Sequence, residues 1–282
     1  MIEVMRETAD LLPPDYRLEG GPDVWHDWRR FGSLLYHLTR RHLSARYRGS
    51  ILGFVWSIIN PLLMMAVYSF VFRYVFRSSI PGLPYAVYFL TGLLVWNCFR
   101  TASFNAATSI VDHLPLVKRL YFPRVVLPLS VIFANVVNYL TTIPILLVFN
   151  LALGVSPPST IIFFPVVLIL LLCLATGVGL LAAGIQSFFH DLLQLLDVLF
   201  TLWFFMTPII YPMSFLQGSL TPELLNLYMI NPMVGITLLT HAVFLGQPIS
   251  IHVVLIAAFG AVGSLALGWH CFSRLSLRFA DI

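Results

Sequence analysis

The chain has little charge and almost no lysine. Of its 282 residues, 10% are charged, and Lys118 is the only lysine. A nucleotide-binding P-loop needs the pattern Gly-Lys-Ser/Thr so that its lysine reaches the phosphates, and Lys118 instead follows Val117. The chain therefore lacks a P-loop of its own, and any ATP-driven step must be powered by another polypeptide.

Metal and redox motifs are missing as well. Cys98, Cys173 and Cys271 are isolated within apolar segments and form no C-x-x-C pair. No H-E-x-x-H motif occurs, and the few acids inside apolar segments, chiefly Asp197, are too sparse for a metal cage or a proton-relay chain. We expect no metal site and no cofactor in this chain.

Apolar residues dominate what is present. The hydrophobic fraction is 59% and the mean hydropathy is +0.89, far above the averages of a soluble domain. The chain is predicted to be an all-α integral membrane protein. Its net charge of +4 is then expected to face anionic lipid headgroups rather than nucleic acid.

Six segments are long and apolar enough to cross a bilayer, which takes about 20 residues. They lie near residues 55–76, 85–110, 125–153, 161–186, 194–213 and 251–272. Eight arginines precede the first segment, Lys118, Arg119 and Arg124 follow the second, and Arg274 and Arg278 follow the last. By the positive-inside rule both termini are cytoplasmic.

Residues 1–50 divide into two parts. Residues 1–24 are rich in proline and glycine and are predicted to form a flexible arm. Within 25–50, Phe31, Leu34 and Leu38 share one arc of a helix and Arg30, His37 and Arg41 the opposite arc, which predicts an amphipathic helix at the cytoplasmic membrane interface. A plain lipid anchor is the alternative. No apolar run precedes about residue 51, so we expect the first span of the 51–282 domain to act as an uncleaved membrane signal.

Several motifs resemble one known family in order and spacing. They are RYRGSILGFVWSIINPLLMMAVYSFVF, LPLVKRLYFPRVVLPLS, FFMTPIIYP, INPM and RLSLRFADI. Together they resemble the permease subunit of type-2 ABC exporters of polysaccharide, the family that moves O-antigen, capsule or teichoic-acid chains across the bacterial cytoplasmic membrane. The chain departs from the family before the fifth span, where basic residues are often found, because it has Phe188, Phe189, His190 and Asp191. Asp191 is still expected to cap the next helix.

The resemblance implies partners. It implies a homodimer paired with two copies of a cytoplasmic ABC ATPase that bind ATP and magnesium, and a polyprenyl-diphosphate-linked glycan as substrate. The loop from Asp112 to Arg124 is the expected ATPase-coupling element, and an ordinary positive-inside loop is the alternative. The coupling residues are Asp112, His113, Leu116, Lys118, Arg119, Tyr121, Phe122 and Arg124.

A headgroup site is expected at the start of the first span. Arg46 and Arg48 lie where a guanidinium can fork onto the diphosphate, although arginines that only anchor the span are the alternative. Asn60 and Pro61 loosen the helix just inside the membrane. The predicted headgroup and gate residues are Arg46, Tyr47, Arg48, Gly49, Ser50, Asn60 and Pro61.

A sugar polymer needs hydrogen-bonding groups and aromatic faces along its path. Polar residues recur every three or four positions on the second span, and Arg100 beside them must face protein or water. Aromatic side chains that face lipid are the alternative for the rings. The predicted pathway residues are Tyr68, Phe72, Phe76, Asn97, Arg100, Thr101, Asn105, Trp203 and Tyr211.

Residues 214–250 contain no basic residue and are expected to form short re-entrant helices before the last span, or else a folded external loop. Three other functions stay open at this point. They are export of a small lipophilic drug or lipid, an intramembrane glycosyl- or acyltransferase, and a scaffold that transports nothing. Scattered His190, Asp191 and Asp197 give the transferase little support.

Overall fold

The computed structural model describes residues 28–47, 55–71, 82–114, 117, 122–189, 191–219, 221–276 and 279. The elements within these ranges are helices, as expected from the sequence. They are α2 (Trp28–Tyr47), α3 (Trp56–Phe70), α4 (Tyr85–Asp112), α6 (Val126–Ala152), the 3-10 helix η5 (Ser159–Phe163), α7 (Phe164–Gln186), α8 (Leu192–Phe205), α9 (Met213–Ser219), α10 (Pro222–Met229), α11 (Pro232–Leu245) and α12 (Ile251–Ser276).

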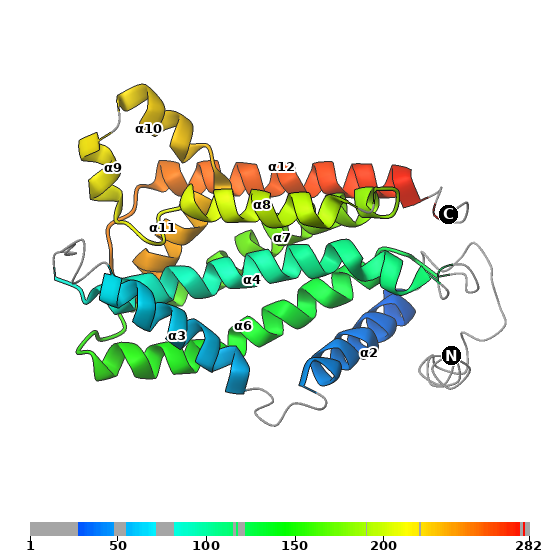
Figure 1. The fold of residues 1–282 in the computed structure, drawn as a ribbon, viewed down its shortest axis with the longest axis horizontal. Helices are drawn as coiled ribbons and strands as arrows, with labels where there is room; N and C mark the ends of the chain where they lie inside the picture. The colour runs from blue at the N-terminus through cyan, green and yellow to red at the C-terminus, as the bar shows by residue number, and fades with distance from the viewer. Residues whose placement is uncertain are drawn as a thin grey trace.

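Long helices run side by side along the bundle, with α2 at one end and α9, α10 and α11 at the other (Figure 1). Within the described residues, three stretches are long and apolar enough to cross a membrane: Val126–Ala152, Ser159–Gln186 and Ile251–Ser276. Counting the bent pair α10 and α11 as one span gives four. Three of the six predicted spans are therefore matched by length and composition.

Helix α4 differs from these three because it lies inside the bundle. It has 28 residues, about 42 Å at 1.5 Å per residue, and it packs against α3, α6, α7, α8 and α11. A helix covered by protein can carry more polar residues than a helix that faces lipid. Its length fits the predicted second span. Its many polar residues are tolerated because protein covers the helix.

The predicted fifth span, 194–213, is longer than the helix found there. Helix α8 has 14 residues and ends at Phe205, because Thr207 precedes Pro208 and Pro212 follows soon after. A residue before proline is disfavoured in helical geometry, and proline donates no main-chain hydrogen bond. The helix therefore ends at Phe205, before the predicted end of the span at residue 213. Asp191 occupies the position before α8, but its side chain makes no capping hydrogen bond.

The apolar arc of α2 packs on protein. Leu34 and Leu38 are buried, and α2 contacts α6. The cluster around them takes residues from α4, α6, α7 and α12 and also includes Val117 and Phe279. The apolar arc of this helix thus faces the bundle, and its exposed side carries Tyr36, His37 and Arg40. The place of the helix at the membrane interface stays a prediction.

Helices α7 and α12 approach each other at two glycines. A Cβ on Gly268 would lie 2.0 Å from the Gly177 carbonyl oxygen, and a Cβ on Gly177 would lie 2.3 Å from the Ser264 carbonyl carbon. Side-chain atoms essentially never approach main-chain atoms this closely, so the two helices can hold this spacing only without a side chain here. Small residues serve the same purpose in other membrane helix pairs.

We predict that Gly268→Ala lowers the free energy of unfolding by about 2 kcal/mol, because the added methyl group forces α7 and α12 apart. Gly263→Ala on the same helix is the matched control, since a Cβ there meets nothing within 4 Å. It should leave stability unchanged or raise it slightly, as alanine favours helix. Thermal unfolding of the purified chain in detergent measures both. Equal stability of the two variants would contradict the close approach.

The α9 end of the bundle contains irregular backbone that is tied to α4. The Tyr85 hydroxyl donates to the Ile210 carbonyl at 2.8 Å, and the Tyr88 hydroxyl lies 3.0 Å from the Pro208 carbonyl. Helices α10 and α11 follow and meet at 85°. At the bend, the Asn231 side chain accepts from the Met233 amide at 3.0 Å and so caps α11. Short helices before the last span were predicted from 214–250, and the structure has them.

Candidate functional site

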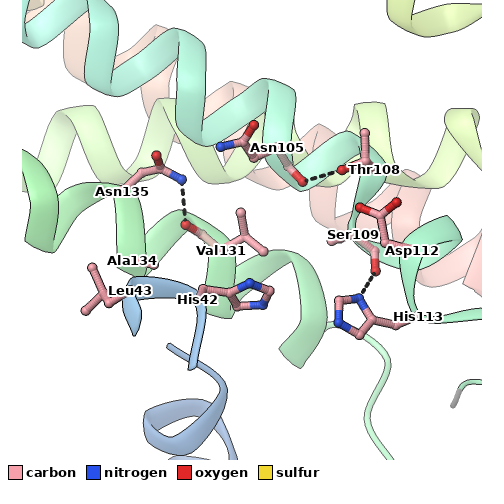
Figure 2. A pocket seen from close by; sticks show the side chains of 10 residues that line it. All are labelled: His42, Leu43, Asn105, Thr108, Ser109, Asp112, His113, Val131, Ala134 and Asn135. Carbon is pink, nitrogen blue, oxygen red and sulfur yellow. Dashed lines mark hydrogen bonds between the residues drawn. The ribbon is translucent and has the colours of Figure 1, made fainter. Parts of the chain in front are cut away.

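A polar pocket opens between α2, α4 and α6, at the end of the bundle away from α9 and α10. Its volume is about 300 Å³. Figure 2 shows polar side chains from all three helices directed toward it. The lining residues are His42, Leu43, Asn105, Thr108, Ser109, Asp112, His113, Val131, Ala134 and Asn135.

Four side chains of this pocket donate a hydrogen bond to a main-chain carbonyl. The Thr108 and Ser109 hydroxyls donate to carbonyls three residues earlier, at 3.2 and 2.7 Å. His113 Nδ1 lies 2.9 Å from the Ser109 carbonyl oxygen, and because a carbonyl only accepts, Nδ1 carries the hydrogen. The Asn135 amide donates to the carbonyl four residues earlier at 2.8 Å. The Thr108 and Ser109 hydroxyl oxygens can each still accept a hydrogen bond.

His42 holds an unusual position in the lining. Its Nε2 is buried and has no hydrogen-bond partner among the described residues, and its ring stands edge-on to His113 with the centroids 5.8 Å apart. Burial, and then the nearby His113 and Arg41, lower the pKa of His42 from 6.5 to about 4, against a smaller opposite effect of Asp112. His42 is therefore neutral near pH 7.

The lowered pKa of His42 predicts acid sensitivity. Between about pH 6.5 and 4 the unfolded chain binds a proton at His42 that the folded chain refuses, so stability falls as the pH drops through this window and is fully present above it. His42→Gln should remove that part of the slope, at most about 1.4 kcal/mol per pH unit. Melting temperatures in detergent at stepwise pH measure the effect.

His37→Gln is the control for this prediction, since His37 is exposed on the same helix. It should keep the slope of the unchanged chain. If His42→Gln and His37→Gln show the same dependence on pH, the burial of His42 has no energetic consequence.

A second polar surface runs along α4 and α8. Arg100 Nη2 lies 2.5 Å from Asp197 Oδ1, and the two side chains are 40% and 57% exposed. Gln194 and Thr201, one turn to either side of Asp197, are exposed as well. A charged pair at membrane depth is costly against lipid and belongs beside protein or water. Leu195, Val198, Leu199, Leu202 and Phe205 form a separate exposed apolar stripe on α8.

The predicted pathway residues fall into different places. Arg100, Asn97 and Thr101 are half-exposed near the ion pair, whereas Asn105 lines the pocket. Of the predicted aromatic pathway residues, three lie in the described ranges, and each contacts another part of the chain. Tyr68 stacks on Phe89 at 4.7 Å, the Trp203 indole donates to Asn231 Oδ1 at 2.8 Å, and the Tyr211 hydroxyl donates to the Phe205 carbonyl at 2.5 Å.

The predicted coupling residues also separate. Asp112 and His113 line the pocket. Arg124 donates to the Ser276 carbonyl, and its guanidinium lies 5.9 Å from the centre of the Phe279 ring. Phe122 packs at the edge of the same apolar cluster. Arg124 thus holds the end of α12 against the start of α6.

The structure does not describe the remaining predicted residues, or describes only their main chain, so their roles stay predictions. Arg48, Gly49, Ser50, Phe72, Phe76, Leu116, Lys118, Arg119 and Tyr121 are not within the described ranges, and the side chains of Arg46, Tyr47, Asn60 and Pro61 are not described.

Several polar residues of these sites were absent from the predicted set, among them Thr108 and Ser109 in the pocket and Thr201 on the second surface. His42 and Asn135 complete the pocket, and Asp197 and Gln194 complete the second surface. Asp197 was noted as a rare intramembrane acid, and a search for its countercharge would have pointed to Arg100. His42 follows Leu38 by four residues and so shares the apolar arc of α2, which faces the bundle.

With this geometry in place, the comparison with known proteins identifies the fold family. Residues 33–244 match the ABC-2 type transporter family. The chain belongs to the ABC-2 type transporter family. The match covers α2 through most of α11, and so contains both polar surfaces.

Similar proteins within this ABC-2 family are polysaccharide export permeases by name. The chain is 38% identical over 215 residues to an O-antigen export system permease protein, RfbA, from Myxococcus xanthus, covering 76% of this chain and 81% of that protein. It is 30% identical over 251 residues to RfbA from Klebsiella pneumoniae, covering 88% and 94%. It is 24% identical over 221 residues to the capsule polysaccharide export inner-membrane protein CtrC from Neisseria meningitidis, covering 76% and 79%. The family expected from the sequence motifs is confirmed.

Proposed function

We propose that this chain is the membrane permease of an ATP-driven exporter that moves lipid-linked polysaccharide across the bacterial cytoplasmic membrane. The observation that carries the proposal is similarity to O-antigen export permeases over most of both chains, 88% and 94% in one case. The proposal favours a polysaccharide over a small lipophilic drug. The glycan is O-antigen, capsule or teichoic acid in class.

The proposed topology has six spans with both termini in the cytoplasm. Helices α6, α7 with η5, and α12 supply three crossings, and we assign the others to α3, α4 and α8 with their flanking residues. The excess of arginine before the first span and the basic residues after α4 support this orientation. The pocket end of the bundle is then cytoplasmic, α2 lies at the inner interface, and α9 to α11 form the outer, re-entrant end.

The polar surface of α4 and α8 is the proposed wall of the translocation pathway. Its ion pair of Arg100 and Asp197 is half-exposed on one copy of the chain and needs a polar surrounding in the membrane. A homodimer that places two such surfaces face to face would enclose a channel with hydroxyl, amide and charged groups, to which a glycan can hydrogen-bond. The apolar stripe of α8 would then meet lipid or the second copy.

Energy is proposed to come from two ATPase subunits that bind ATP and magnesium. They would dock at the loop that follows Asp112, beside the cluster that joins Val117 and Phe279 to α2 and α6. Arg46 and Arg48, at the junction of α2 and α3, are the proposed contacts for the lipid diphosphate.

Gene deletion tests the proposed function. Loss of this gene should remove the glycan from the cell surface and leave polyprenyl-linked glycan inside, as measured by surface labelling and lipid extraction. The intact gene should restore export only in cells that also carry the ATPase gene. The purified chain alone should hydrolyse no ATP, since it has no P-loop lysine. Surface glycan at the normal level in the deletion strain would refute the proposal.

A charge exchange tests the proposed pathway wall. Arg100→Asp alone or Asp197→Arg alone leaves two like charges together, so we expect at least a tenfold loss of surface glycan at matched protein level. The double exchange restores attraction and should recover a large part of it. Asp191→Arg is the control, because it reverses an exposed acid outside the pair. Full export by both single variants would exclude a role for the pair.

A further inference from the structure

The pocket between α2, α4 and α6 is separate from the pathway wall proposed on α4 and α8. We propose that it binds a primary ammonium group. This inference rests on the proposed membrane orientation for the source of its ligand.

The lining offers several hydrogen-bond acceptors and one carboxylate. The Thr108 and Ser109 hydroxyl hydrogens and the His113 Nδ1 hydrogen are all committed to main-chain carbonyls. What these side chains offer to a guest is hydroxyl oxygen and, on a neutral ring, the second imidazole nitrogen. The unpartnered Nε2 of His42 adds a polar atom that gains from a hydrogen bond. A guest rich in N–H donors complements this set.

The charge of the lining points the same way. Asp112 is the one acid among the described residues that line the pocket, and none of them is lysine or arginine. Arg41 lies beside His42 but does not line the pocket. A phosphate group would be repelled by the Asp112 carboxylate and would find no lysine or arginine in the lining, so the pocket does not suit the lipid diphosphate. A cation with several N–H donors pairs with the carboxylate and uses the acceptors.

The guest is an amine rather than a metal ion. Among the described residues, no three His, Cys, Asp or Glu side chains are grouped so as to hold a metal. The volume of about 300 Å³ also exceeds the space of a bare ion. Two sources supply a primary ammonium at this depth: an ethanolamine lipid headgroup, reached from the inner interface beside α2, and an amino sugar of the glycan.

Lipid binding to the purified full-length chain tests the proposal. The delipidated chain is titrated with short-chain phosphatidylethanolamine, phosphatidylcholine and phosphatidylglycerol, and affinity is read from thermal stabilisation. The choline headgroup keeps the charge but lacks N–H donors, so phosphatidylethanolamine should bind about tenfold more tightly. Equal binding of the ethanolamine and choline lipids, with no binding of free amines, would overturn the proposal.

Matched variants locate the effect. Asp112→Asn should abolish the preference for the ethanolamine lipid, and Asp191→Asn, the same change at an exposed acid elsewhere, should keep it. Thr108→Val removes one acceptor and keeps the side-chain shape, so it should weaken the preference to a smaller degree. It also provides an answer if Asp112→Asn folds poorly. A preference that survives both Asp112→Asn and Thr108→Val would place the amine elsewhere and refute the assignment.

Soluble probes separate the two sources. Glucosamine that stabilises the chain more than glucose, with no response to the ethanolamine lipid, would support the ammonium site and assign the glycan as its source. The reverse result would support the site and assign the lipid. Stabilisation by magnesium chloride alone, lost in Asp112→Asn, would overturn the proposal in favour of a metal. Binding is measured on the purified chain, so its outcome is distinct from surface export, which tests the proposed function.

Discussion

The packing of α4 is the constraint on which the rest of the bundle depends. Five helices pack against it, and its two ends carry different chemistry. Near its first turns, tyrosine hydroxyls satisfy the irregular backbone around Pro208, and near its last turns, short polar side chains line the pocket. In hydrocarbon every polar main-chain group needs a partner, so a stretch such as 206–212 is tolerated only where a neighbour supplies one. Helix α4 supplies it.

Much of this architecture follows from hydropathy alone. The segments 125–153, 161–186 and 251–272 were placed within a few residues of α6, η5 with α7, and α12, because a long apolar run that faces lipid has few other structures open to it. The periodic polar stripe of α4 was also visible, because three- and four-residue spacing defines one helical face. These are local signals, and local sequence carries them.

The parts that sequence reasoning missed depend on long-range geometry. Asp197 is 97 residues from Arg100, and nothing local says that their helices meet. His42 falls on the apolar arc of α2, so its neighbour His113 emerges only once α2 has docked on the bundle. The early end of α8 had a local signal in Pro208, but the apolar run through Ile209 and Ile210 outweighed it in the span assignment.

The buried aromatic residues show why composition is a weak guide to a sugar path. Trp203 was predicted to face the pathway. The centre of its ring lies 5.0 Å from that of Phe99, and its indole N–H donates to the side chain of Asn231, which caps α11. A ring with a polar edge is well suited to join an apolar core to a polar helix end. By contrast, the exposed polar positions on α4 and α8 have no such packing use, which makes them the better indicator of a wet surface.

The two ends of the bundle therefore differ in how they can move. At the α9 end, hydrogen bonds of fixed direction hold α4, the segment after α8 and α11 together, and such bonds weaken steeply with misalignment. At the other end, Arg124 fixes the end of α12 by a hydrogen bond, but α2 packs through an apolar cluster with α6, α7 and Phe279, and non-directional contacts allow a helix to slide. The pocket lies at this more adaptable end, between α2 and α4. A guest bound there would contact both helices, and so would favour arrangements of the bundle in which α2 lies against α4.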